Sequence, residues 1–161
     1  YPRQRDYGGL FFLANGAREA VELGPAHTSP NGVGLSPDEA TVYMADTMTA
    51  RLWAFDLSAP GEIKPHSPFN KGRVVATMPD LQYFDSLAVA ASGNICVATI
   101  LNGGVTTVTP DGARDHIEFP DPFVTNICFG GADMRDAWVT LSGTGQLAKC
   151  RWPEPGLTLN Y

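Results

Sequence analysis

Short apolar stretches separated by polar turns run along most of the chain, and from residue 31 onward they repeat in three blocks. Each block opens on a polar residue, Asn31, Asp85 or Asn126, and the openings lie 54 and 41 residues apart. An apolar stretch then leads to a polar turn (SPDE, ASGN or GGADMRD) and to a second apolar stretch (TVYMAD, ICVATI or AWVTLS). Apolar runs this short between turn residues are typical of β-strands, so the pattern predicts repeated hairpins.

A third stretch follows in each block, RLWAFDL, GVTTVTP or QLAKCRW, beginning 19 or 20 residues after the opening residue. These stretches largely alternate apolar and polar positions, as half-buried strands do. In the first two blocks an outer stretch follows, GRVVATM or ARDHIEF. Each block therefore reads as a four-stranded antiparallel unit of about 40 to 50 residues, a period typical of the blades of a β-propeller.

The opening segment GGLFFLANGAREAVELG matches the third and fourth strands of one more blade. We therefore predict an all-β fold, a β-propeller of about three and a half four-stranded blades in one domain spanning residues 1–161. Residues 1–24 hold the outer strands of one blade, and residues 31–80, 85–120 and 126–161 form the successive blades. Closed propellers have four to eight blades. We thus expect either a missing N-terminal half or a second copy to close the ring, and the chain starts at Tyr1 rather than at a methionine.

Composition agrees with a turn-rich β protein and excludes several function classes. The 161 residues include 17 glycines and 13 prolines, and only 17% are charged, which argues against a helical bundle. The net charge is −6 and the 11 basic residues are scattered, so nucleic acids and anionic membranes are poor partners. No apolar run approaches the roughly 20 residues of a membrane-spanning helix.

The cysteines and histidines offer little chemistry of their own. Cys96, Cys128 and Cys150 are widely spaced and odd in number, which favours buried thiols in a reducing, cytoplasmic setting over disulfides or a zinc site. The three histidines are His27, His66 and His116, and they share no spacing that suggests a triad or a metal site. We expect them to be exposed loop residues.

The opening residues of the three blocks are the strongest candidates for chemistry. In a propeller the first strand of each blade lines the central channel, so Asn31, Asp85 and Asn126 are expected to point toward one axial site. Amide and carboxylate oxygens suit hard divalent cations such as calcium, magnesium or manganese, and zinc remains open. The alternative is that these residues only cap turns, as Asn and Asp often do.

These residues also lie in recognisable motifs. PNGVGLSPDEATVYMADT followed by RLWAFDL resembles the signature of the regucalcin, gluconolactonase and lactone-hydrolase family, and FDSLAVAASGNICVAT and TNICFGG match its later blades. The resemblance implies a six-bladed propeller with one divalent metal ion in its channel, in which this chain corresponds to the C-terminal half. Most characterised family members hydrolyse lactones or related esters.

The resemblance also implies roles for single residues. Asn31, in the PNG motif, corresponds to a metal ligand, and Asp85 corresponds to both a ligand and the usual candidate for the general base. Ser86 departs from the glycine that the family most often has there. The family's early metal-binding Glu, and the Arg and Asn that position substrate, belong to the N-terminal half. Three residues are weaker candidates for lining the channel or contacting substrate, and these are Asn126, Thr125 and Asp46. Asp46 also fits a turn-bonding role.

The expected function is therefore that of a metal-dependent lactonase acting on a small-molecule lactone, or of the C-terminal half of one. Calcium is the first expectation for the metal, with zinc, manganese or magnesium as alternatives. Two other readings stay open: a calcium-binding propeller without catalytic activity, and a scaffold propeller in which Asn31 and Asp85 are turn residues.

Overall fold

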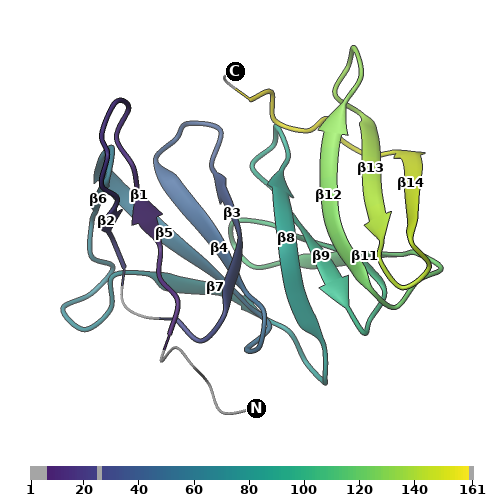
Figure 1. Cartoon of the computed structure of the whole chain (residues 1–161), viewed down its shortest axis with the longest axis horizontal. Helices are drawn as coiled ribbons and strands as arrows, with labels where there is room; N and C mark the ends of the chain where they lie inside the picture. Colours follow the sequence, from purple (N-terminus) through teal and green to yellow (C-terminus); the bar gives the residue numbers. More distant parts are fainter. Residues whose placement is uncertain (1–6, 25–26, 160–161) are drawn as a thin grey trace.

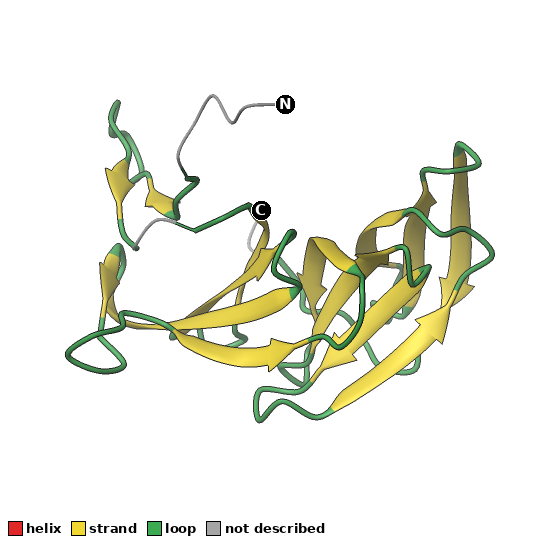
Figure 2. Ribbon diagram, turned by 90° about the horizontal axis from the view of Figure 1, so that it is seen from below, coloured by secondary structure: helices red, strands yellow, loops and turns green. Residues whose placement is uncertain are grey.

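A computed structural model describes residues 7–24 and 27–159, and within these ranges the chain forms strands and turns without a helix. The described part therefore contains no helix long and apolar enough to cross a membrane. The strands form antiparallel sheets that follow one another in chain order and stand side by side along the long axis of the molecule (Figures 1 and 2).

The N-terminal part holds a small hairpin and the first large sheet. Strands β1 (Phe11–Phe12) and β2 (Val21–Glu22) form the hairpin. The first sheet consists of β3 (Pro30–Leu35), β4 (Thr41–Asp46), β5 (Arg51–Ala59), β6 (Glu62–Ile63) and β7 (Arg73–Thr77). Both β6 and β7 pair with β5, so the main sheet runs β3-β4-β5-β7 and β6 extends the far end of β5.

Two further sheets complete the described chain. The second has the order β8 (Tyr83–Val89), β9 (Ile95–Ile100), β10 (Gly104–Val108) and β11 (Arg114–Glu118). The third consists of β12 (Val124–Gly130), β13 (Asp136–Leu141) and β14 (Gln146–Arg151). Up to Leu159, where the described residues end, the third sheet has three strands, one fewer than the repeat predicts.

In place of a fourth strand, the segment after β14 reaches back to the second sheet. The amide of Leu157 donates to the carbonyl of Val89 at 2.9 Å, and the amide of Ala91 donates to the carbonyl of Pro155 at 2.9 Å. The amide of Gly156 bonds the carbonyl of Met134, in the turn between β12 and β13 of the third sheet, at 2.7 Å. Residues 155–157, which we call the C-terminal clasp, therefore tie the second and third sheets together.

The apolar core lies between neighbouring sheets rather than at one centre. One cluster fills the space between the hairpin and the first sheet around Phe55, a second lies between the first and second sheets around Leu52 and Phe84, and a third lies between the second and third sheets around Val139. The inner strands β3, β8 and β12 are neighbours in that order. Sheets stacked face to face with their first strands inward form a partial β-propeller, which confirms the predicted fold class.

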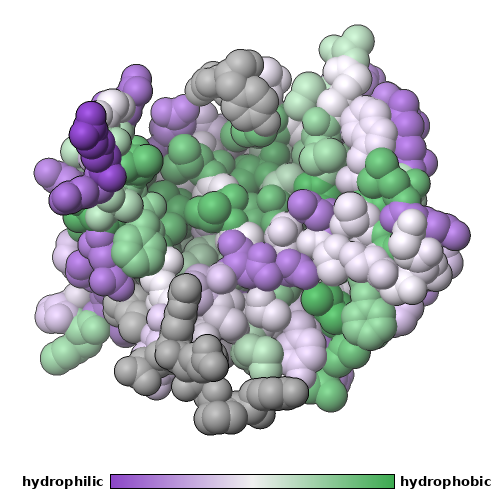
Figure 3. Space-filling view, viewed as in Figure 1, coloured by the Kyte–Doolittle hydropathy of each residue, from purple (hydrophilic) through white to green (hydrophobic). Residues whose placement is uncertain are grey.

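The two ends of this arc of sheets differ. At the N-terminal end face, the outward side of the first sheet, Val33 and Leu35 pair across the ladder with Met44 and Val42. The hairpin covers the latter two, whereas Val33 is 56% and Leu35 is 41% exposed. Figure 3 shows apolar residues gathered in the hollow beside the hairpin.

The C-terminal end face, the outward side of the third sheet, is covered by charged side chains of its own. Arg151 bonds Asp136 at 2.8 Å and Asp133, and Lys149 bonds Asp136 at 2.8 Å. The ammonium of Lys149 also lies 4.9 Å from the ring centroid of Trp138, so the aromatic side chain at this end is partly capped by a cation.

The cysteines only partly match the expectation of buried thiols. Cys96 is fully buried, whereas Cys150 is half-buried and Cys128 is exposed. Burial raises the pKa of the Cys96 thiol to about 11. The expectation fails at Cys128 because this residue pairs with Trp138 on the C-terminal end face, which no further sheet covers in the described residues.

Candidate functional site

All three inner strands carry a bulge at the position where the sequence places its polar opening residue. The ladder shifts by one residue between Pro30 and Val33 in β3, between Phe84 and Leu87 in β8, and between Val124 and Asn126 in β12. A bulge leaves one residue unpaired and turns its side chain away from the normal alternation, which is why bulges recur beside active sites. The repeated bulge thus presents one polar side chain from each inner strand.

The register of the ladder identifies those side chains. Asn31 and Asp85 are the first residues after the last paired position of β3 and β8, and in β12 that place belongs to Thr125 rather than to Asn126. The equivalence expected for Asn126 is therefore off by one residue. Asn126 is exposed and pairs with Thr140. The hydroxyl of Thr125 contacts the hydroxyl of Thr140 at 2.9 Å.

A glycine brings the first two inner strands into close contact. A Cβ atom at Gly32 would lie 2.7 Å from the amide nitrogen of Leu87 and 2.8 Å from the carbonyl oxygen of Asp85. No side chain fits against backbone atoms at that distance, so the glycine of the PNG motif allows β3 to approach β8. Asn31 and Asp85 then stand next to each other, and the Asn31 side chain lowers the pKa of the Asp85 carboxyl.

The environment of Asp85 combines burial with hydrogen bonding. Burial raises the pKa of the Asp85 carboxyl, and the bonds from the Asn31 side chain and the Ser86 amide oppose that rise. The Asn31 amide nitrogen also donates to the Thr47 hydroxyl at 3.3 Å. Because its nitrogen faces the Thr47 hydroxyl, the oxygen of Asn31 is the atom that can contact a bound cation.

The two oxygen donors fit a hard divalent cation chemically, although they make only part of its coordination shell. Asn31 supplies an amide oxygen and Asp85 a desolvated carboxylate whose ionised form a cation would favour. In residues 7–24 and 27–159, no three His, Cys, Asp or Glu side chains form a group that could hold a metal ion. Any further ligand of such a cation is thus expected from water, from backbone or amide oxygens, or from outside this chain.

Asp46 lies at the end of β4 and serves the turn that follows. Its side chain is 2% exposed and accepts a hydrogen bond from the Ser29 hydroxyl at 2.8 Å. The same hydroxyl accepts from the Met48 amide at 2.7 Å, and the Ser29 carbonyl accepts from the Thr47 amide at 2.9 Å. The structure thus gives Asp46 the turn-bonding role, in a turn whose Thr47 holds Asn31.

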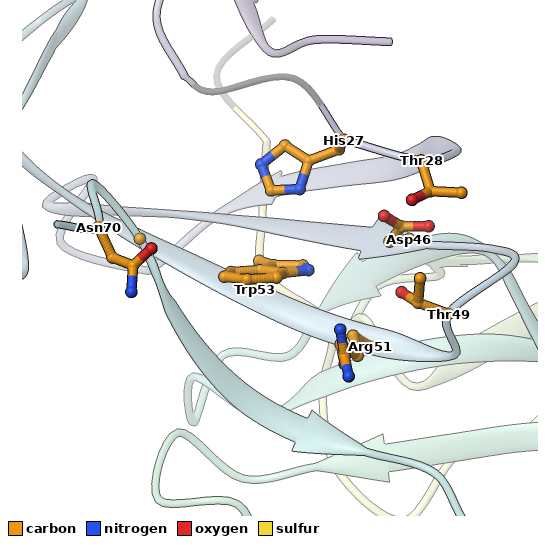
Figure 4. Close-up of a pocket in the computed structure, with 8 residues that line it drawn as sticks. His27, Thr28, Asp46, Thr49, Arg51, Trp53 and Asn70 are labelled. Carbon is orange, nitrogen blue, oxygen red and sulfur yellow. The ribbon is translucent and has the colours of Figure 1, made fainter. Parts of the chain in front are cut away.

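Asp46 also lines a side pocket that the sequence does not reveal. This pocket has a volume of about 260 Å³ and lies on the outward side of the first sheet. Its walls come from the segment before β3, the end of β4, the turn that follows, the first residues of β5 and the segment before β7. They are formed by His27, Thr28, Asp46, Thr49, Arg51, Trp53, Asn70 and Gly72. In Figure 4 the imidazole of His27 lies over the indole of Trp53, whose nitrogen end is turned toward Asp46 and Thr49.

The burial of His27 corrects the expectation of three exposed loop histidines. His27 is 6% exposed, and its ring meets those of Trp53 and Phe55 edge-on at 5.0 and 5.7 Å. Burial lowers the pKa of His27, and the nearby Asp46 carboxylate partly opposes this effect. His116 lies half-buried on β11 and contacts the Thr106 hydroxyl at 3.0 Å, whereas His66 is exposed as expected.

With the geometry established, comparison with known proteins identifies relatives. Residues 1–143 match the family model described as the SMP-30/Gluconolactonase/LRE-like region. The chain is 31% identical over 159 residues to a 6-deoxy-6-sulfogluconolactonase from Pseudomonas putida, covering 96% of this chain and 53% of that protein. It is 27% identical over 139 residues to a gluconolactonase from Zymomonas mobilis, covering 80% of this chain and 36% of that protein.

A solved structure shows the same fold. Regucalcin from Agrobacterium tumefaciens, a calcium-binding protein, superposes with a TM-score of 0.74 at 23% identity, over 94% of this chain and 56% of that one. The chain therefore spans about half the length, or less, of the relatives that it matches.

Proposed function

The chain belongs to the SMP-30/gluconolactonase/LRE-like family, and from that premise we propose that it is the C-terminal half of a metal-dependent hydrolase that opens lactones. The observation that carries this proposal is the pairing of Asn31 and Asp85 at matching bulges on two adjacent inner strands. The relatives named as lactonases support the same class of substrate, a small cyclic ester.

In this proposal Asp85 is both a metal ligand and the general base. Its carboxylate takes the proton of the attacking water and then returns it to the ring oxygen of the opening lactone. Asn31 is a neutral ligand and contributes its amide oxygen. A bound divalent cation, with calcium as the first candidate and zinc, manganese or magnesium as alternatives, would polarise the lactone carbonyl and stabilise the developing negative charge.

We also propose that the ring is completed at the N-terminal end face, either by the other half of the protein or by a second copy. Support comes from Val33 and Leu35, which are apolar, exposed and adjacent to an already buried cluster. A closed ring of six blades would place further ligands and substrate contacts opposite Asn31 and Asp85.

The test is hydrolysis of sugar and aromatic lactones by the whole protein, followed as acid release, with calcium, zinc or manganese added and with a chelator. Asp85→Asn removes the general base and is expected to lower kcat by about 100-fold or more. Asn31→Ala is expected mainly to raise the metal concentration needed for half-maximal rate.

Asp111→Asn is the matched control, because Asp111 is an exposed turn carboxylate bonded to its neighbour Thr109. This variant should hydrolyse lactones at the normal rate. Normal turnover by Asp85→Asn would refute the assignment of the base, and metal binding without any hydrolysis would favour a calcium-binding protein without catalytic activity.

A further inference from the structure

The bulge on β12 gives Thr125 the same surroundings that the bulge on β3 gives Asn31. The Asn31 amide nitrogen donates to the hydroxyl of Thr47, the first residue after β4, at 3.3 Å. In the third sheet the Thr125 hydroxyl contacts the hydroxyl of Ser142, the first residue after β13, at 2.6 Å. The two side chains therefore take matching directions at matching bulges.

The backbone around the two positions matches as well. The amide of Thr47 donates to the carbonyl of the residue directly before β3, and the amide of Ser142 donates to the carbonyl of the residue directly before β12, both at 2.9 Å. Strands β8 and β12 are neighbours. Thr125 thus lies on the strand next to that of Asp85, at the equivalent position of its bulge.

A buried carboxylate fixes the turn after β13, which begins with Ser142. Asp121 is 2% exposed and accepts a hydrogen bond from the Phe123 amide at 2.7 Å. It also accepts from the amide of Gly143 at 3.2 Å, and from the amide and the hydroxyl of Thr144 at 2.7 and 2.8 Å. The hydroxyl at the start of this turn is therefore held in place before any ligand binds, which lowers the cost of binding.

The third bulge carries a hydroxyl where the other two carry an amide and a carboxylate. The Thr125 hydroxyl also contacts that of Thr140 at 2.9 Å, so Thr140, Thr125 and Ser142 form a chain of three hydroxyls. Three hydroxyls have three protons, and the two contacts within the chain use two of them, which leaves one proton and several lone pairs for a ligand. Hard divalent cations prefer carboxylate, carbonyl and water oxygens. A group that both donates and accepts matches a hydroxyl group of a ligand better than a cation.

We propose that Thr125, together with Ser142, is a specificity residue that hydrogen-bonds a hydroxyl group of the lactone and does not bind the metal ion. This inference rests on the proposed lactone site at Asn31 and Asp85. A polar group that loses its partner disfavours the ligand that lacks the matching hydroxyl. Thr125 therefore favours hydroxylated lactones over plain cyclic esters.

The test measures binding of two six-membered lactams to the whole protein with calcium present, by ligand-observed NMR. Lactams resist hydrolysis, and gluconolactam carries hydroxyl groups on its ring whereas valerolactam carries none. Thr125→Val should raise Kd for gluconolactam about two- to ten-fold, the effect of losing one neutral hydrogen bond, and leave Kd for valerolactam unchanged. Thr125→Ser keeps a hydroxyl and should bind gluconolactam nearly as well as the parent protein.

Thr41→Val is the matched control, because the Thr41 hydroxyl bonds Asp56 at 3.2 Å, at the end of β4 away from Asn31. This variant should bind both lactams with unchanged Kd. Equal rises in Kd for the two lactams in Thr125→Val would overturn the proposal, as would weak gluconolactam binding by Thr125→Ser or binding of neither lactam. A higher calcium concentration for half-saturation in Thr125→Val would also overturn it, because Thr125 would then be a metal ligand. Lactam binding needs no turnover, so these outcomes are separate from the hydrolysis that tests the lactonase proposal.

Discussion

The two end faces of the arc differ in what they present to solvent: the N-terminal end face is apolar, and the C-terminal end face is charged. Each is the outward side of a β-sheet that no further full sheet covers in the described residues. The N-terminal end face presents Val33 and Leu35 beside a hairpin that buries only part of the apolar surface. The C-terminal end face pairs Arg151 and Lys149 with two aspartates and places a cation over Trp138.

This difference shows that the first sheet depends on residues outside it to cover its outward apolar side. The cluster around Phe55 is closed by Leu10 and Leu23, which come from the hairpin region rather than from the first sheet. Within the described residues the third sheet meets solvent with ion pairs made by its own strands, so in this chain its stability depends less on covering residues. We therefore expect the N-terminal end face to respond strongly to changes in packing and the C-terminal end face to respond mainly to pH and salt.

The largest expected effect comes from Phe55→Ala. Phe55 is fully buried between the hairpin and the first sheet, and removal of such a ring costs about 3–5 kcal/mol of unfolding free energy. Trp138→Ala on the C-terminal end face should cost about 1 kcal/mol, the usual size for a partly exposed site. Urea unfolding of both variants measures the difference.

Hydrogen exchange shows where the Phe55 effect acts. The Leu23 amide bonds the Leu10 carbonyl at 2.8 Å, and its protection should fall in Phe55→Ala while that of the Val139 amide in the third sheet persists. Equal losses of free energy in Phe55→Ala and Trp138→Ala would contradict the distinction between the two end faces.

A smaller effect on stability, but a clear one on association, is expected when the exposed apolar residues are made polar. The double variant Val33→Ser and Leu35→Ser should reduce concentration-dependent self-association of the 161-residue chain, because contiguous apolar patches promote contacts. Each substitution should change the unfolding free energy by about 0.5 kcal/mol or less, as exposed positions usually do. Sedimentation at several concentrations gives the readout.

Leu147→Ser provides the control for this variant. Leu147 is also exposed, at 64%, but it lies on the C-terminal end face, where it pairs with Thr140. It should leave the association unchanged. Loss of association in Leu147→Ser but not in the double variant would contradict the prediction, because it would place the contact on the C-terminal end face.

The smallest expected effects are two separate losses of stability in acid. Burial lowers the pKa of folded His27 below its unfolded value of 6.5, so the unfolded chain binds the proton more tightly. Stability should therefore fall as pH drops below about 6.5. Hydrogen bonds from Arg151 lower the pKa of Asp133 to about 2. The stability that the ionised Asp133 contributes is therefore complete above pH 3.8 and is lost as the pH falls from 3.8 toward about 2.

Unfolding midpoints in urea across this pH range measure both losses. His27→Gln should remove the loss of stability below about pH 6.5 and leave the loss below pH 3.8. Asp133→Asn should do the reverse. Added salt should weaken only the lower one, since exposed ion pairs are screened. An unchanged upper slope in His27→Gln would show that another group causes it.

Sequence reasoning reached the fold and the matching positions of Asn31 and Asp85, because both depend on local repetition. The repeated turns and alternating strands predicted the blades, and the register placed Asn31 and Asp85 at equivalent positions on neighbouring inner strands, where the structure has them. It missed the register at Thr125, since a bulge adds one residue to a strand without changing its composition.

The side pocket was out of reach for a different reason. His27 lies in a segment rich in proline and small polar residues, which reads as an exposed loop. Its burial depends on Trp53 and Phe55, more than 20 residues away in sequence. Spacing along the chain carries no signal for such a contact.

The C-terminal clasp has a consequence for the order in which the protein can fold during synthesis. Val89 ends the first strand of the second sheet and Ala91 lies in the turn that follows, yet their partners at residues 155–157 follow Val89 by more than 60 residues. On a ribosome that adds about 5–20 residues each second, this edge stays open for several seconds after β8 has emerged. The second sheet can therefore form early, but it is closed only after the whole third sheet has been made.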